Sequence, residues 1–234
     1  MYNNMLICCF CGEGRATFLE NEILRAALRC PLCGEALAAV GSSLVCGGVR
    51  RHTYDMARAG YVNLNTHLPQ SGDTAEMAAA RQTFLRNGYY APLADALTRL
   101  ALAHAPGTSL LCDAGCGEGY YTEAVGEKFA AVLGADLSKY ALALAGKRAK
   151  RAGLAGKLLY ATASVYALPL ADNTCDCVMS VFAPIAADEA FRVLKPGGIL
   201  LTAAAGRDHL TELKAELYDT VIPNDRRRDY PENL

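Results

Sequence analysis

From residue 108 onward, short apolar runs alternate with longer stretches in which apolar positions recur at helical spacing. The runs of strand length are residues 108–115, 130–137, 156–164, 175–184 and 197–206, and the stretches between them have the length and pattern of helices. Alternation of this kind predicts an α/β fold, with a mostly parallel sheet and helices on both of its faces.

The preceding segment, residues 63–107, shows a different pattern. It opens with the polar loop "NTHLPQSGD" and then predicts a helix over residues 74–87, with Asp73 as the cap and Gly88 as the stop. A second helix is predicted over residues 90–104. We interpret this segment as a helical connector or lid.

Residues 1–62 contain six of the ten cysteines and little sustained periodicity. Such a segment has too small a core to fold unaided and needs a covalent or metal cross-link. The predicted organisation is therefore an amino-terminal extension and metal-binding module (1–62), the connector (63–107), and an α/β domain (108–234).

Composition restricts the possible functions. The formal net charge is −1, so a nucleic-acid surface has to be a local patch, and 52% hydrophobic residues allow a substantial core. No apolar run reaches membrane-spanning length, and "MYNNMLICCF" lacks the features of a secretory signal. We therefore expect a cytoplasmic protein with no membrane partner, in which paired cysteines are metal ligands rather than disulfides.

The stretch "LLCDAGCGEGYYTEAV" places three glycines between a predicted strand and a predicted helix, where open parallel sheets bind ligands. The next strand ends at Asp136, where a carboxylate can accept hydrogen bonds from the two ribose hydroxyls of a nucleotide. The alternative is a simple tight turn. A dinucleotide would require G-x-G-x-x-G, whereas this loop reads G-x-G-x-G with Glu118 inside it, which repels a pyrophosphate and suits an α-amino group.

Several segments in order carry a family resemblance. "DAGCGEG" resembles the first motif of class I (Rossmann-like) S-adenosylmethionine-dependent methyltransferases. "CPLC", "YDMARAGYVNL", "GDTAEMAAARQTFL", "GYYAPL" and "GRDHLTELKAELYD" are similar to the RlmA-type 23S rRNA (guanine-N1)-methyltransferases. This resemblance implies S-adenosylmethionine and zinc as cofactors, and methylation of guanine N1 in a 23S rRNA hairpin.

The resemblance implies that the zinc ligands are Cys30, Cys33, Cys46 and His52. Five residues, "GGVRR", separate Cys46 from His52, which is more than is usual in the family. A rival set combines Cys8 and Cys11 with Cys30 and Cys33 as a four-cysteine ribbon, and unligated thiols are the third possibility. "CDC" at residues 175–177 lies in an apolar run, where cysteine is usually a small buried hydrophobe.

Carried over from the family, the cofactor-binding residues are Tyr90, Gly115, Gly117, Glu118, Asp136 and His209. Ala163 and Ser164 are weaker candidates for contact with the adenine. A core tyrosine would look the same as a cofactor-binding Tyr90, and a solvent-facing residue at a helix start would look the same as His209.

For the acceptor, Phe182 and Pro184 follow the fourth strand, where related nitrogen methyltransferases stack the base; core packing is the alternative for Phe182. Spacing identifies no general base for the N1 proton. Phosphate contacts are predicted from Arg50, Arg51, Arg81 and Arg86, and from the run "KRAKR" at residues 147–151, although each is individually consistent with a solvated surface.

The family pattern continues beyond the end of this sequence with a carboxyl-terminal hairpin. We therefore expect a methyltransferase domain that is incomplete at that end, with five strands and an apolar edge at residues 198–205 that favours a homodimer. Two alternatives to the rRNA enzyme remain open, namely a small-molecule methyltransferase and a catalytically weak RNA-binding remnant.

Overall fold

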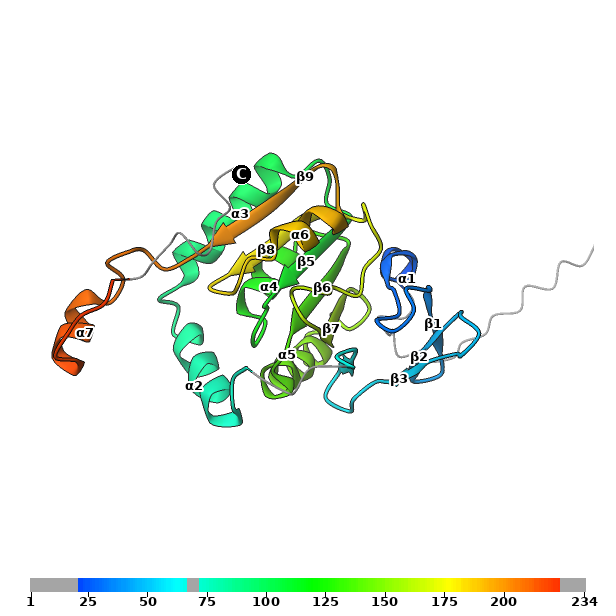
Figure 1. Ribbon diagram of the computed structural model, residues 1–234, viewed down its shortest axis with the longest axis horizontal. Coiled ribbons are helices and arrows are strands. Elements are labelled where there is room, and N and C mark those ends of the chain that lie inside the picture. The colour runs from blue at the N-terminus through cyan, green and yellow to red at the C-terminus, as the bar shows by residue number, and fades with distance from the viewer. Residues whose placement is uncertain (1–20, 67–71, 224–234) are drawn as a thin grey trace, which may run out of the picture.

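The computed structural model describes residues 21–66 and 72–223. A six-stranded sheet, in the order β4-β7-β6-β5-β8-β9, forms its centre, and every neighbouring pair in it is parallel (Figure 1). The strands are β4 (Tyr61–Asn63), β5 (Leu110–Ala114), β6 (Ala131–Asp136), β7 (Leu158–Thr162), β8 (Cys175–Val181) and β9 (Leu194–Ala203). The predicted parallel α/β fold is confirmed.

The expectation of five strands is wrong, because β4 forms a sixth at the edge beside β7. β4 has only three residues, too few to show a period, and its pairing with β7 is supported by a side-chain hydrogen bond between Thr162 and Asn63. The strand straddles the predicted boundary between residues 62 and 63, so the amino-terminal segment supplies part of the central sheet.

A second, antiparallel sheet in the amino-terminal segment has the order β1-β2-β3. Its strands are β1 (Leu37–Val40), β2 (Ser43–Cys46) and β3 (Thr53–Asp55), preceded by α1 (Glu22–Ala27). This small module lies beside the central sheet, at the blue end of the chain in Figure 1.

The other helices are α2 (Ala75–Arg86), α3 (Ala91–His104), α4 (Tyr120–Gly126), α5 (Lys139–Arg151), α6 (Ala187–Val193) and α7 (Thr211–Leu217). The predicted cap of α2 is wrong, because the helix is capped by Thr74, whose hydroxyl accepts a hydrogen bond from the Met77 amide. Asp73 instead forms an ion pair with Arg81 at 2.7 Å. Among the described residues, no helix combines the length and the apolar character needed to cross a bilayer.

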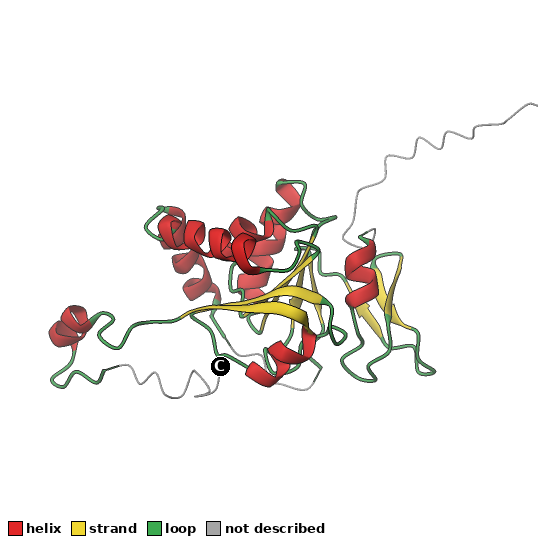
Figure 2. Cartoon of the chain, turned by 90° about the horizontal axis from the view of Figure 1, so that it is seen from above, coloured by secondary structure: helices red, strands yellow, loops and turns green. Residues whose placement is uncertain are grey.

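The two faces of the central sheet are covered differently (Figure 2). Leu111, Val132 and Tyr160 pack with α3, α4 and α5 on one face. On the other face, Leu110 and Leu133 share a core with Leu24, Leu28, Leu37 and Leu44 of the amino-terminal module and with α6. The amino-terminal module therefore covers this face of the central sheet, where a helix would otherwise pack. Its apolar residues belong to the core of the sheet and do not form a separate core.

The edge opposite β4 is formed by β9, which among the described residues pairs only with β8. Beyond it the chain extends away from the body to α7, whose Leu213 and Leu217 are exposed (Figures 1 and 2). Cys175 and Cys177 of "CDC" are buried on opposite faces of the sheet, as expected of small hydrophobes.

Candidate functional site

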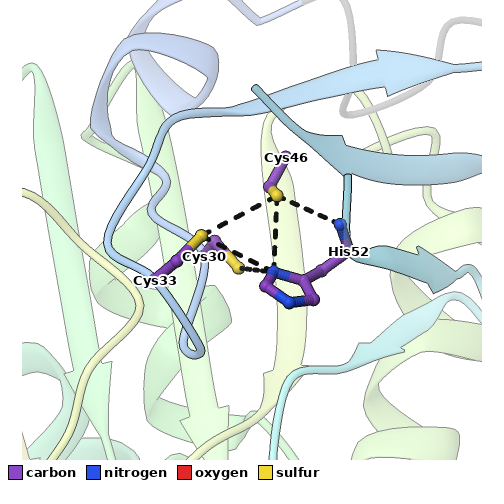
Figure 3. A group of neighbouring side chains, drawn as sticks. All are labelled: Cys30, Cys33, Cys46 and His52. Atoms are coloured by element: carbon purple, nitrogen blue, oxygen red, sulfur yellow. Dashed lines mark hydrogen bonds between the residues drawn. The ribbon is translucent and has the colours of Figure 1, made fainter. Parts of the chain in front are cut away.

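Four potential metal ligands converge in the amino-terminal module (Figure 3). The Sγ atoms of Cys30, Cys33 and Cys46 and a ring nitrogen of His52 all lie within 4.8 Å of one another. Cys30 and Cys33 lie in the turn between α1 and β1, Cys46 ends β2, and His52 directly precedes β3. Three thiolates and one imidazole are a donor set typical of structural zinc, so the residues fit the metal.

The long spacer between Cys46 and His52 is accommodated as a hairpin loop. The Cys46 amide donates to the His52 carbonyl at 2.9 Å, and the Arg51 amide donates to the Gly48 carbonyl at the same distance. The five-residue spacer therefore forms a closed loop that keeps the two ligands together. Cys8 and Cys11 of the rival set lie outside the described residues.

Tyr54 supports the first ligand. Its hydroxyl lies 3.0 Å from Cys30 Sγ, and both residues are buried. Burial raises the pKa of the Cys30 thiol, but hydrogen bonds from Tyr54 and from the backbone of Leu32 and Cys33 outweigh it and lower that pKa to about 6. The thiolate form that binds metal is thus favoured near neutral pH.

A cleft of about 650 Å³ opens at the carboxyl ends of β5, β6 and β8, beneath α2. Every residue predicted for the cofactor lines it: Tyr90, Gly115, Gly117, Glu118, Asp136 and His209. Ala163, Ser164, Phe182 and Pro184 line it as well. The structure brings these residues together from segments far apart in the sequence, and their contact with a cofactor remains a prediction.

The glycine loop is shaped by backbone requirements. Gly115 has φ +87°, and a Cβ there would collide with the side chain of Ala183. Gly117 has φ +53° with open space where its Cβ would be. Asp136 accepts hydrogen bonds from the amides of Gly117 at 2.9 Å and Ser138 at 2.7 Å, which fixes the loop against the end of β6. The loop thus presents backbone to the cleft.

Glu118, which the loop pattern places beside a ligand amino group, forms an ion pair within the protein. It is 1% exposed, and its Oε2 accepts from Arg148 Nη1 of α5 at 2.7 Å. Burial raises the pKa of Glu118, and the charge of Arg148 opposes this shift. Its Oε1 has no hydrogen-bond partner within the described part of the chain, so that oxygen has its full capacity to accept hydrogen bonds.

Asp113 is a cleft residue that the sequence analysis missed. It is 2% exposed at the end of β5, and its Oδ2 accepts from the Thr122 hydroxyl at 2.6 Å, while Oδ1 has no partner among the described groups. Burial raises the pKa of this carboxyl to about 7. The signal was available, since Asp113 is the first residue of "DAGCGEG".

Phe182 forms part of an aromatic wall. It follows β8 with φ +54°, is 46% exposed, and meets the ring of Tyr90 edge-on at 5.9 Å. A non-glycine residue held in this conformation carries strain that is most often found at functional sites. The ring is therefore half-exposed in the cleft, which argues against simple core packing.

Comparisons with known proteins agree with this geometry. A family model described as a methyltransferase domain matches residues 112–202, and one described as the RlmA N-terminal zinc ribbon matches residues 28–69. A putative 23S rRNA (guanine-N1)-methyltransferase of Micromonospora griseorubida is 39% identical over 80% of this chain and 68% of its own length. The chain belongs to the RlmA-type 23S rRNA (guanine-N1)-methyltransferase family.

A second relative in this family, the 23S rRNA (guanine(748)-N(1))-methyltransferase of Streptomyces fradiae, is 38% identical over 80% of this chain and 66% of its own length. The chain thus spans about two thirds of these RlmA-type relatives. A putative S-adenosylmethionine-dependent methyltransferase from Methanococcus maripaludis superimposes with a TM-score of 0.50 at 20% identity, covering 64% of this chain and 74% of the other. That likeness confirms the fold.

Membership of the RlmA-type family accounts for both the Cys3His cluster and the glycine-loop cleft. S-adenosylmethionine and zinc are the cofactors, and the chain is an S-adenosylmethionine-dependent methyltransferase with an amino-terminal zinc ribbon. The glycine loop and Asp136 lie where the methyltransferase sheet binds ligands.

The predicted phosphate-binding role of the "KRAKR" run is wrong for Arg148. Its guanidinium turns inward and binds Glu118 and Glu123, each at 2.7 Å, because α5 packs against the glycine loop on that side. Arg81 and Arg86 are also paired, with Asp73 and Glu123 respectively. The exposed cations Lys147, Arg151, Arg50 and Arg51 remain candidates for phosphate contacts.

Proposed function

We propose that this chain transfers a methyl group from S-adenosylmethionine to N1 of a guanine in a 23S rRNA hairpin loop. The observation that carries the proposal is the occurrence, in one packed body, of a Cys3His centre and a glycine-loop cleft with an exposed aromatic wall. The curated relatives that are similar to this chain in sequence are named as 23S rRNA guanine-N1-methyltransferases, which supports the proposal.

The cofactor supplies an electrophilic methyl group on a positively charged sulfur. We propose that Asp136 accepts hydrogen bonds from its ribose, that the glycine loop follows its amino-acid end, and that Tyr90 and His209 contact it from the connector and the carboxyl-terminal segment. Each of these residues lines the cleft.

Phe182 is the proposed stacking surface for the guanine. A base taken out of its RNA loop can lie on this half-exposed ring at the end of β8, so that N1 faces the methyl group in line with the breaking bond to sulfur. As N1 bonds to carbon, its proton passes to a base or to water. Catalysis would then depend largely on positioning.

The test separates RNA from small-molecule acceptors. Purified protein is incubated with methyl-labelled cofactor and, in parallel, with undermethylated ribosomal RNA or a small-molecule extract. We expect label in the RNA and 1-methylguanosine after digestion to nucleosides. Label only in small molecules would identify a small-molecule methyltransferase, and binding of the RNA without transfer of label would identify a catalytically weak RNA-binding remnant.

For partners, we propose an rRNA hairpin as substrate and a homodimer formed through β9, with the protein acting in the cytoplasm. The dimer is supported by the position of β9, which has a neighbouring strand on one side only among the described residues. An open strand edge has unpaired backbone groups that favour pairing with another chain.

A further inference from the structure

Aromatic rings form a row that runs from the cleft to the molecular surface. From Phe182 the row continues to Tyr90 at 5.9 Å, to Phe84 at 5.9 Å, and to Tyr89 at 5.5 Å between ring centroids. The first three rings line the cleft, whereas Tyr89 lies outside its lining and is 69% exposed. We call Phe84 and Tyr89 the outer rings.

The turn between α2 and α3 holds the outer rings in place. Gly88 has φ +84°, its amide donates to the Leu85 carbonyl, and its carbonyl accepts from the Ala91 amide, so the turn is closed on both sides. Phe84 is on the last turn of α2, and Tyr89 directly precedes the cap of α3. The rings are therefore carried by helix ends, and little conformational entropy is lost when a ligand stacks on them.

The aromatic row extends beyond the cleft, whose volume is sufficient for the cofactor and a small acceptor. A cofactor and a small acceptor would be contained within the cleft and would leave Tyr89 without a contact. A nucleotide of RNA is tied to neighbours that must also be placed. Unstacked bases in RNA loops are recognised by stacking on aromatic side chains, and every base offers a face for this.

We propose that the outer rings stack the loop nucleotide adjacent to the target guanine, so that Phe182 and Tyr89 hold successive bases at the two ends of one aromatic row. The occupant is thus a single-stranded nucleobase of the substrate RNA. This inference rests on the proposed function, and it assigns to Tyr89 a role in binding RNA without contact to the cofactor.

The test uses the full chain, saturating S-adenosylmethionine and a 23S rRNA hairpin with 2-aminopurine replacing the base next to the target guanine. Stacking quenches 2-aminopurine fluorescence. Tyr89→Ala should raise the hairpin Kd about tenfold, within the range for losing one base–aromatic stack, and should abolish the quenching. Tyr89→Phe should restore both, and the cofactor Kd should be unchanged.

Tyr218→Ala is the matched control, since this tyrosine is 64% exposed on the segment that ends α7 and does not line the cleft. If Tyr89→Ala behaved like this control while the wild-type protein bound and methylated the hairpin, the stacking role would be wrong and the proposed function would stand. If the wild-type protein neither bound nor methylated RNA, both would fail. A third outcome is that Tyr89→Ala binds the hairpin normally but binds assembled ribosomal subunits more weakly. This result would assign Tyr89 to a contact with a ribosomal protein and would overturn the inference.

Discussion

Asp136 links the protein's own backbone to the proposed ribose site. Its carboxylate already accepts two amide hydrogen bonds, from Gly117 and Ser138, and burial raises its pKa against the lowering effect of those bonds. A carboxylate has room for further donors on each oxygen. One residue can therefore fix the glycine loop and still accept hydrogen bonds from a ribose.

Asp136→Ala should weaken S-adenosylmethionine binding by about tenfold or more. A hydrogen bond to a charged group contributes about 1.5–3 kcal/mol, and tenfold corresponds to about 1.4 kcal/mol. Calorimetry on the variant measures this directly. Asp95→Ala, an exposed acid on α3, is the control and should bind normally; equal affinity in both variants would remove Asp136 from the site.

The raised pKa of Asp113 predicts a dependence of stability on pH. Burial raises the pKa of its carboxyl from 3.8 to about 7, so the folded state holds a proton that the unfolded state loses above pH 4. The resulting stabilisation is complete below pH 4 and is lost as pH rises to about 7. Asp113→Asn cannot ionise. Urea unfolding should therefore show the wild-type protein losing stability relative to Asp113→Asn between about pH 4 and pH 7, whereas a constant difference would show an ordinary carboxyl.

At the residue scale, sequence reasoning identified positions better than orientations. The motif placed Glu118 in the loop and "KRAKR" on a helix, and both placements are correct. Neither the motif nor the helical period indicates that Arg148 turns inward to bind Glu118, because this depends on how α5 packs against the loop.

At the scale of elements, the zinc module covers part of the central sheet. Leu24, Leu28, Leu37 and Leu44 lie in the same core as Leu110 and Leu133 of β5 and β6. Loss of the metal should therefore destabilise one face of the methyltransferase sheet as well as the module. This coupling differs from that of an appended domain with a core of its own.

A matched pair of variants tests the ligand set. Cys46→Ser should lose the zinc and make residues 28–69 sensitive to protease, because metal binding supplies the folding free energy of such a module. Cys8→Ser should retain one zinc per chain. Elemental analysis decides, and the opposite result, with zinc kept in Cys46→Ser and lost in Cys8→Ser, would support the rival four-cysteine set.

Elements were predicted well where the pattern was long. Alternating strands and helices beyond residue 108 revealed the parallel sheet, and the connector helices were placed to within a few residues. The short strand β4 was missed because its pairing with β7 is tertiary and leaves no period in the sequence. The α2 cap was misassigned because Asp73 and Thr74 are adjacent, and only the structure shows which side chain meets the helix amides.

At the scale of the whole molecule, β9 is an edge strand of the central sheet, and it carries the proposed homodimer contact. Its residues are only partly buried along most of its length, and β8 is its one neighbour in the described structure. We expect sedimentation to show reversible self-association at micromolar concentration, and amide exchange at residues 199–204 to slow as concentration rises. A monomer at every concentration, with β9 already protected like the central strands, would contradict a dimer through this edge.

A zinc ribbon, a glycine-loop cleft and an aromatic row occur together in this RlmA-type methyltransferase. In the proposed reaction, the methyl group goes to N1 of a guanine in a loop of 23S rRNA. A methyl group at N1 blocks Watson–Crick pairing, so it stops reverse transcription one nucleotide before the modified base.

Primer extension across 23S rRNA, after incubation of undermethylated rRNA with the protein and S-adenosylmethionine, is therefore the most direct test. We expect one new stop, at a guanine in a hairpin loop, which is absent without cofactor and absent with a Phe182→Ala variant that retains cofactor binding. Methylated RNA without any such stop, or a stop at a base other than guanine, would contradict the proposed reaction.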